Sequence, residues 1–214
     1  MLVTKYKVEL TLTEPMLGTV PKSDTVFADF LAQKALKRRE EAGTITTDAA
    51  AALIAEEAET LPSDPEERGW TGFHTDEKGP HLYDYQIKGF MKEAGNLLKD
   101  FPGVEVKQLR DKIDNYLFIR PRRIYLGAIE AEPLERPLRA MTMQGPRVSL
   151  VRSDKIAAGS IIEFELWVLP FVLKGREIFT KELLTFLLEY GELKGLGQWR
   201  NGGFGGFTAS IAPM

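Results

Sequence analysis

Two segments of this chain alternate apolar and polar residues so regularly that each is expected to be a β-strand with one buried face. Every second position from Tyr6 to Leu12 is apolar, and the positions between them hold lysine, glutamate or threonine. The same alternation runs from Ile162 to Val168, with Glu163, Glu165 and Trp167 on the opposite side. Because successive side chains of a strand point to opposite faces, both strands should belong to a sheet with one face in the core.

A helical repeat lies between these two strands. Apolar residues recur there at spacings of three and four, which indicates an amphipathic helix, at Ile87, Phe90, Met91, Ala94, Leu97, Leu98 and Phe101. Asp84 is positioned as the N-cap of this helix. A second helix is predicted over Thr180–Tyr190, with Thr180 as the cap and Gly191 as the stop. Residues 24–42 and 48–60 are predicted to be helical as well.

The remaining segments carry weaker patterns. Residues 116–126 predict one strand interrupted at Pro121, or a pair of strand segments, because proline donates no ladder hydrogen bond. Residues 204–211 predict a last strand. Residues 61–80 are rich in proline, glycine and charge, so a loop is expected there. Residues 128–159 are expected to be irregular.

The strong elements therefore follow the order strand, helix, strand, strand, helix, strand. This order predicts an α+β fold with a ferredoxin-like (RRM-like) βαββαβ core. The chain is expected to be a single domain over residues 1–214, with a core of about 1–13, 81–126 and 160–214. A helical, acidic insertion of about 14–80 follows the first strand. An arginine-rich insertion of about 127–159 separates the second and third core strands.

Charge is distributed unevenly over these parts. The net charge is −3, but residues 24–67 alone carry −7, which leaves +4 for the rest of the chain. Residues 120–152 contain seven arginines and no lysine. Arginine without lysine favours planar, bidentate contacts to phosphate or carboxylate. The arginines are therefore either an anion-binding strip or a solvated face that pairs with the acidic segment.

Several classes of protein are disfavoured by what the sequence lacks. It contains no cysteine, which excludes disulfides and cysteine-based metal or redox sites. It has no apolar run of the roughly 20 residues that a membrane helix needs, and no signal-peptide pattern at residues 1–15. We expect a cytoplasmic protein that binds no membrane, no metal and no cofactor.

A stretch near the end of the chain, GLGQWRNGGFGGF, holds 6 glycines in the 13 residues 195–207. Glycine is costly to order, so its concentration around Trp199, Arg200 and Phe204 requires a reason. One reading is a loop whose backbone approaches an anionic ligand closely, with the arginine on a phosphate and an aromatic ring on a base. The other reading is a helix-to-strand connection with tight turns and a buried aromatic filling.

Four stretches together resemble the RAMP superfamily of CRISPR-associated proteins, and its Cas7-like branch in particular. The opening strand YKVELTLTEPMLGT resembles the family's first strand and turn. YDYQIKGFMKEA resembles the start of its first core helix, where Gln86, Ile87, Lys88 and Gly89 match the motif S-L-K-G. DKIAAGSIIEFEL resembles a turn and strand of the family, and GLGQWRNGGFGGF resembles its glycine-rich loop.

The resemblance implies a subunit of a ribonucleoprotein in antiviral defence, in the host or in a mobile element, that binds an RNA backbone independently of sequence. Its partners would be guide-like or single-stranded RNA and further copies of itself or other CRISPR effector subunits. The arginine-rich insertion would correspond to a thumb that presses on the guide RNA. The residues expected to contact RNA are Gln86, Lys88, Gly89, Lys92, Arg122, Arg123, Arg136, Arg139, Arg147, Trp199, Arg200, Gly202, Gly203, Phe204 and Gly205.

Two alternatives stay open. The chain could be an interaction protein, such as an anti-CRISPR, that mimics a Cas7 subunit and binds or caps an effector complex. It could also be an RNA endonuclease, although we expect no enzyme, because His74 and His81 form no recognisable pair with a nucleophile and are expected in a surface loop. Asp24 has no matching context for a cleavage role, so no catalytic residue is assigned.

Overall fold

The computed structural model describes residues 3–22, 70–98, 106–143 and 145–214. The chain forms two compact units. Unit 1 comprises Met1–Met16, His81–Ala128 and Ile156–Met214, and unit 2 comprises Leu17–Pro80 and Ile129–Lys155. The helices expected over 24–42 and 48–60, together with Asp24, lie outside the described residues. Whether the two units act as a single domain stays a prediction.

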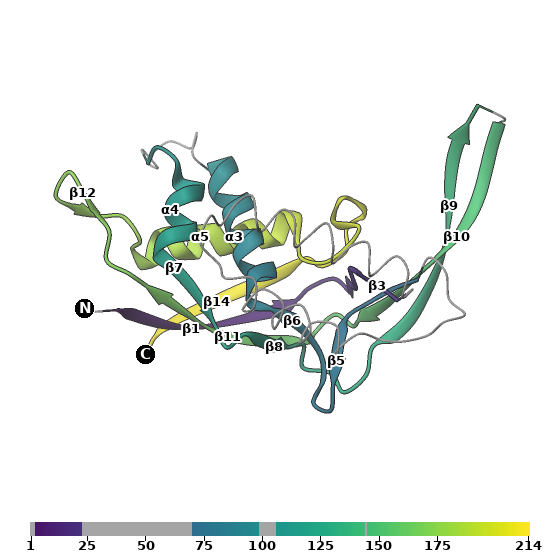
Figure 1. The fold of residues 1–214 in the computed structure, drawn as a ribbon, viewed down its shortest axis with the longest axis horizontal. Coiled ribbons are helices and arrows are strands. Elements are labelled where there is room, and N and C mark those ends of the chain that lie inside the picture. Colours follow the sequence, from purple (N-terminus) through teal and green to yellow (C-terminus); the bar gives the residue numbers. More distant parts are fainter. Residues whose placement is uncertain (1–2, 23–69, 99–105, 144) are drawn as a thin grey trace, which may run out of the picture. The chain divides into compact units, whose positions relative to one another are not determined.

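A four-stranded sheet forms the centre of unit 1 (Figure 1). Its strands are β1 (Thr4–Leu12), β7 (Leu117–Arg120), β11 (Ile161–Val168) and β14 (Phe207–Pro213), in the spatial order β14-β1-β11-β7. The neighbouring strands are antiparallel. The two alternating segments of the sequence are adjacent, with Val8 opposite Phe164, and their apolar sides are buried as predicted.

The helices of unit 1 lie on one side of this sheet (Figure 1). They are α3 (Asp84–Leu98), α4 (Leu109–Tyr116) and α5 (Lys181–Lys194). The expected apolar side of α3 is buried from Ile87 to Leu98, except that Leu97 is 55% exposed, and Phe101 lies outside the described residues. α4 was not predicted, because its eight residues bury only Leu109 and Ile113. It packs closely on α3 at Gly95, where a Cβ would meet the Ile113 side chain.

The start of α5 agrees with the position predicted from the sequence, and its end does not. The Thr180 side chain accepts a hydrogen bond from the Leu183 amide at 3.4 Å, as expected for an N-cap. The helix continues past Gly191 to Lys194 and ends at Gly195, which has φ 69°. Gly191 is not a helix stop, because its missing side chain makes room for the ring of Phe207 from β14.

Residues 116–126 form two strand segments, one of the two predicted alternatives. β7 ends before the cis peptide Arg120–Pro121, and β8 (Arg123–Tyr125) follows it. β8 pairs with β6 (Gly79–Tyr83), where His81 lies opposite Tyr125. His81 is fully buried, so its expected place in a surface loop is wrong. A short hairpin of β12 (Val172–Leu173) and β13 (Arg176–Glu177) precedes α5.

Unit 2 contains a long antiparallel ribbon of β9 (Glu132–Thr142) and β10 (Gly145–Ile156), which are paired from Lys155↔Glu132 to Gly145↔Thr142. The expectation of irregular structure in 128–159 is therefore wrong. Alternation gives no core signal at Val148 and Leu150, which lie on one side of β10 and are each 65% exposed.

The base of this ribbon joins a small sheet. β10 runs parallel to β4 (Trp70–Gly72), which pairs with β3 (Val20–Pro21). β5 (His74–Asp76) comes next in the sequence and pairs with β6 in a separate sheet. The described part of the expected loop 61–80 therefore forms strands, and His74 is 2% exposed. β2 (Met16–Leu17) lies where the chain passes from unit 1 to unit 2.

Asp154 holds the strands of unit 2 together. Its carboxylate accepts hydrogen bonds from Lys22 Nζ at 2.9 Å and from Trp70 Nε1 at 3.1 Å. Gly72 makes this possible, since a Cβ there would lie 2.6 Å from the Asp154 carboxylate. A buried carboxylate needs such partners, so this cluster is explained by structure alone.

The described residues thus form a mixed α+β structure with several sheets and three α-helices. Across these described ranges, every helix is too short or too polar to cross a membrane.

Candidate nucleic-acid interface

The first turn of α3 is held by its own side chains. Gln86 Oε1 accepts a hydrogen bond from the Tyr83 amide at 2.8 Å, and Asp84 Oδ1 accepts one from the Tyr85 amide at 2.9 Å. These contacts satisfy amide groups that a helix start leaves without intrahelical partners. Gln86, which we expected to contact RNA, therefore fixes the start of the helix that carries Lys88 and Lys92.

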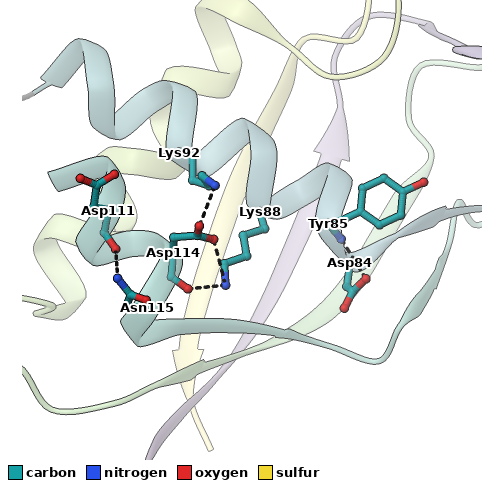
Figure 2. A network of polar contacts seen from close by, with 7 residues as sticks. All are labelled: Asp84, Tyr85, Lys88, Lys92, Asp111, Asp114 and Asn115. Atoms are coloured by element: carbon teal, nitrogen blue, oxygen red, sulfur yellow. Dashed lines mark hydrogen bonds and ion pairs between the residues drawn. The ribbon is translucent and has the colours of Figure 1, made fainter. Parts of the chain in front are cut away.

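Two of the expected RNA-binding lysines converge on one carboxylate of α4 (Figure 2). Lys92 Nζ lies 2.8 Å from Asp114 Oδ2. Lys88 Nζ donates to the Asp114 carbonyl oxygen at 2.6 Å and lies 3.5 Å from Oδ1. The two lysines are one helical turn apart, so their side chains share a face of α3. The arrangement is a pair of cations that already hold an anion.

Burial and pairing act in opposite directions at this cluster. Partial burial lowers the pKa of Lys88 below its ordinary value, although Asp114 pulls it upward. Partial burial raises the pKa of Asp114, but hydrogen bonds and charge from Lys92 and Lys88 outweigh it, so the net shift is downward. Partial removal from water strengthens both the attraction to an anion and the cost of leaving these cations without one.

These side chains line an open groove of about 430 Å³ between α3 and α4. Three cationic side chains face it, from Lys88, Lys92 and Arg110, against the carboxylates of Glu93 and Asp114. Gly89 also lines the groove, and a Cβ at this position would have no atom within 4 Å. The groove therefore offers one excess positive charge and open space beside the helix backbone.

The glycine-rich stretch contains two groups of glycines with different roles. Gly205 has φ 76°, and a Cβ there would collide with the backbone of Leu196. Its carbonyl accepts from the Leu196 amide at 2.8 Å, and its amide donates to the Pro15 carbonyl at 2.9 Å. The Gly206 carbonyl accepts from the Thr13 amide at 2.8 Å. These two glycines fasten the end of the loop to Leu196 and to the segment after β1. For this part of the stretch, the interpretation as a tight helix-to-strand connection holds.

The tip of the loop is different. Trp199 has φ 60° and is 39% exposed, and a short 3₁₀ helix η1 (Arg200–Gly202) follows it. Gly203 has φ 86°, and a Cβ there would meet no atom within 4 Å. The rings of Trp199 and Phe204 lie 6.5 Å apart. Lys194, Trp199, Arg200, Asn201 and Gly202 line a hollow of about 510 Å³.

One ion pair connects this loop to the groove on α3. Arg200 Nη1 lies 2.7 Å from Glu93 Oε2, and Glu93 also lines the groove of Lys88 and Lys92. The two hollows therefore share a border at this pair. Residues 86–92 and 199–203, far apart in the sequence, lie on one surface of unit 1.

The remaining expected residues lie elsewhere. Arg122 stands 4.9 Å from the ring of Tyr83 and 3.8 Å from Asp84 Oδ1, and Arg123 is on β8 opposite Tyr83. Arg136, Arg139 and Arg147 are on the ribbon of unit 2. The side chains of Arg139 and Arg147 lie outside the described part of the structure. The structure thus groups the residues of α3 with those of the loop, and places the ribbon arginines in a separate unit.

Sequence reasoning missed four charged residues that line this surface: Glu93, Arg110, Asp114 and Lys194. Arg110 and Asp114 were missed together with α4. The apolar pair Leu109 and Ile113, spaced by four, was the available signal for that helix. Glu93 and Lys194 carried no signal, because their roles depend on contacts between distant segments.

No family model matches this chain, and no curated protein matches it. Among solved structures, it is similar to a chain in the cryo-EM structure of the Type III-B Cmr-beta bound to cognate target RNA. The TM-score is 0.50 at 12% identity, covering 99% of this chain and 61% of that chain. A chain of a Type IV-B CRISPR complex matches with a TM-score of 0.46 and 10% identity, over 97% of this chain and 90% of that chain.

This chain thus spans about three fifths of the Cmr-beta chain that it matches. At 12% identity the likeness is one of fold.

Proposed function

We propose that this protein is a Cas7-like, RNA-binding subunit of a CRISPR ribonucleoprotein. The observation that carries the proposal is the groove in which Lys88, Gly89, Lys92 and Arg110 lie together beside the Arg200 loop. The fold it shares with a subunit of the Cmr-beta complex supports the same class. We also propose a ferredoxin-like classification of the core, for which the strand order β14-β1-β11-β7 is the support.

Binding would proceed by exchange of anions. A phosphate of the RNA backbone takes the place of the Asp114 carboxylate between Lys88 and Lys92, or of Glu93 on Arg200. Gly89 leaves space for the sugar-phosphate chain to approach the first turns of α3. Such contacts position a strand and carry no base information, so binding is independent of sequence. We propose a binding role and no catalysis.

Two features of the class remain proposals of the same kind. Arg136, Arg139 and Arg147 would extend the contact to RNA from the ribbon of unit 2. Copies of the protein, or other effector subunits, would assemble side by side along the strand.

One observation favours a second candidate. Lys88, Lys92 and Arg200 are each paired with a carboxylate of the protein itself. An interaction protein that mimics a Cas7-like subunit and caps an effector complex would keep the fold and neutralise its RNA-binding cations in this way. It would bind effector subunits and show weak affinity for free RNA.

RNA titrations of the wild type and of the double variant Lys92→Ala/Arg200→Ala distinguish the RNA-binding subunit from the capping protein. We expect wild-type protein to bind a fluorescein-labelled single-stranded RNA in anisotropy titrations, and the variant to lose at least tenfold in affinity, since each charged contact contributes about 1 kcal/mol or more. The slope of log affinity against log salt should fall by about 1.4, or about 0.7 for each lost phosphate contact on a single strand.

The control is Lys181→Ala/Arg176→Ala, which removes the same two charges at exposed positions outside both hollows. Equal losses in the two double variants would mean that only net charge matters, which contradicts a defined groove. An absence of RNA binding by the wild type at 50 mM salt, combined with capture of effector subunits, would favour the capping protein.

A further inference from the structure

The face of the main sheet that points away from the helices carries an unusual row of side chains. On most of this face the strands present lysine, glutamate, threonine and serine, which suits contact with water. At one end, however, Phe118 of β7 lies directly opposite Trp167 of β11, and Trp167 lies directly opposite Lys5 of β1. Three adjacent strands therefore contribute a Phe-Trp-Lys row.

Cations of the protein itself lie over both rings of this row. Lys5 Nζ lies 4.0 Å from the centroid of the Trp167 ring, and the Arg120 guanidinium carbon lies 5.9 Å from it. Lys88 Nζ of α3 lies 5.0 Å from the centroid of the Phe118 ring. Lys5 ends the row on β1, and at the β7 end Lys88 reaches Phe118 from the groove described above.

The tryptophan is held in position. Its indole N–H donates to Glu165 Oε2 at 2.7 Å on the same strand. The Phe118 residue is 38% exposed, although a phenylalanine gains free energy from leaving water. Cross-strand pairing of two aromatic residues stabilises a sheet modestly, by about 0.2–1 kcal/mol, and does not require cations at both ends of the row.

We propose that this row of Phe118, Trp167 and Lys5, together with the neighbouring Arg120, is a second binding site, and that it takes the bases of a single-stranded nucleic acid. Every base has an apolar face that stacks on an aromatic ring, and adjacent cations pair with the phosphates that follow the bases. Two aromatic side chains on neighbouring strands, each with a cation over its ring, are complementary to that alternation of base and phosphate. A base that stacks on either ring displaces the cation over it, and the displaced cation then pairs with the adjacent phosphate.

This site goes beyond the backbone groove, because it engages bases and is independent of Lys92 and Arg200. A strand that occupied both sites would cross the edge of the sheet at Lys88, the residue that touches both.

The test uses the full chain with Trp167→Leu and Phe118→Leu, which keep apolar area and remove the ring. Thermal unfolding verifies that each variant is folded. For a 12-nucleotide RNA, affinity should fall at least about fivefold for each lost ring. For an oligomer of equal length with abasic sites throughout, affinity should be unchanged. Val172→Ala, an exposed apolar residue on β12, serves as the control and should leave both affinities unchanged.

A second readout locates the contact directly. An RNA with 5-iodouridine, which cross-links to aromatic residues on irradiation, should be recovered on a peptide that contains Trp167 or Phe118. Titration with DNA of the same sequence distinguishes the two kinds of nucleic acid. Equal affinity for DNA and RNA would mean that the site binds single strands in general, and tighter binding of RNA would mean that it also contacts the 2′-hydroxyl.

Failure of this site is distinguishable from failure of the groove. Normal RNA binding by Trp167→Leu and Phe118→Leu, with loss in Lys92→Ala/Arg200→Ala, would overturn the stacking site and leave the groove intact. The reverse pattern would support the stacking site alone. Ring-dependent capture of a protein subunit, without any effect on nucleic acid, would also overturn the assignment.

Discussion

Asp114 is the residue whose charge most affects the α3 groove, because one carboxylate holds both lysines (Figure 2). Its side chain is 47% exposed, so its ion pairs contribute little to stability in water. Their consequence is for binding: an RNA phosphate must compete with an anion that is already in place. Glu93 has the same relation to Arg200 on the neighbouring loop.

Removing this internal competitor should strengthen RNA binding. We expect Asp114→Asn to raise the affinity for single-stranded RNA about three- to tenfold at low salt, because Lys88 and Lys92 are released and the groove gains a positive charge. The matched control is Asp111→Asn on the same helix, which changes net charge equally but lies outside the lining of the groove. Similar gains in both variants would show that general charge, and not the lysine pair, determines affinity.

The glycines of the loop should differ sharply in their tolerance of alanine. Gly203→Ala should cost about 1 kcal/mol of unfolding free energy, because φ 86° is unfavourable for alanine while the space around it is open. Gly205→Ala should cost roughly 2–4 kcal/mol, because its Cβ also collides with the Leu196 backbone. Urea unfolding measures both. Equal costs would contradict the division of the loop into a closing part and a tip.

At the scale of elements, the ribbon β9–β10 differs from the core strands, because the described apolar side chains of its distal half, such as Val148 and Leu150, are exposed. An isolated two-stranded hairpin is marginally stable in water at best. Here the ribbon is anchored at its base, where β10 pairs with β4 and Asp154 binds Lys22 and Trp70. Beyond that base, the described side chains of residues 137–150 are exposed or half-buried.

Shortening the ribbon should therefore leave the fold intact. Replacing residues 137–150 by Asn-Gly joins Arg136 to Val151, which are opposite each other, through a two-residue turn. We expect the free energy of unfolding to change by less than about 1 kcal/mol, because no described core residue is removed. RNA affinity should decrease if Arg139 and Arg147 contact the strand.

A thermal unfolding scan and an anisotropy titration of the same preparation check both parts of this prediction. A large loss of stability would show that the distal ribbon belongs to the core of unit 2. An unchanged RNA affinity would remove the ribbon arginines from the proposed interface.

At the scale of the whole molecule, the uneven distribution of charge along the sequence explains why an acidic chain can carry cationic surfaces. The net charge of −3 is an average over a strongly acidic stretch at 24–67 and a basic remainder. Recognition of an anionic ligand depends on the local arrangement of charge and not on this average. The single-domain organisation and side-by-side assembly stay predictions at this scale.

Much of unit 1 could be predicted from local sequence. Strands β1 and β11, helix α3 and the start of α5 follow from periodicity and capping, because a core face imposes a regular apolar spacing on any element that covers it. The ribbon escaped prediction for a related reason: exposed apolar residues such as Val148 and Leu150 mark no core face. The Gly191 stop was wrong because a ring from β14 uses that glycine, and such a contact is visible only in the folded chain.

The candidate site divides in the same way. The sequence by itself determined which residues could bind an anion, since Lys88, Gly89, Lys92 and Arg200 stood out by type and by motif. Only the tertiary structure decided that the α3 helix and the loop share a surface, where Asp114 and Glu93 form ion pairs with the cations. It also decided that Phe118, Trp167 and Lys5 form a row across three strands. The physical reason is that these relations join residues distant in sequence, and only strand register and helix packing determine which of them meet.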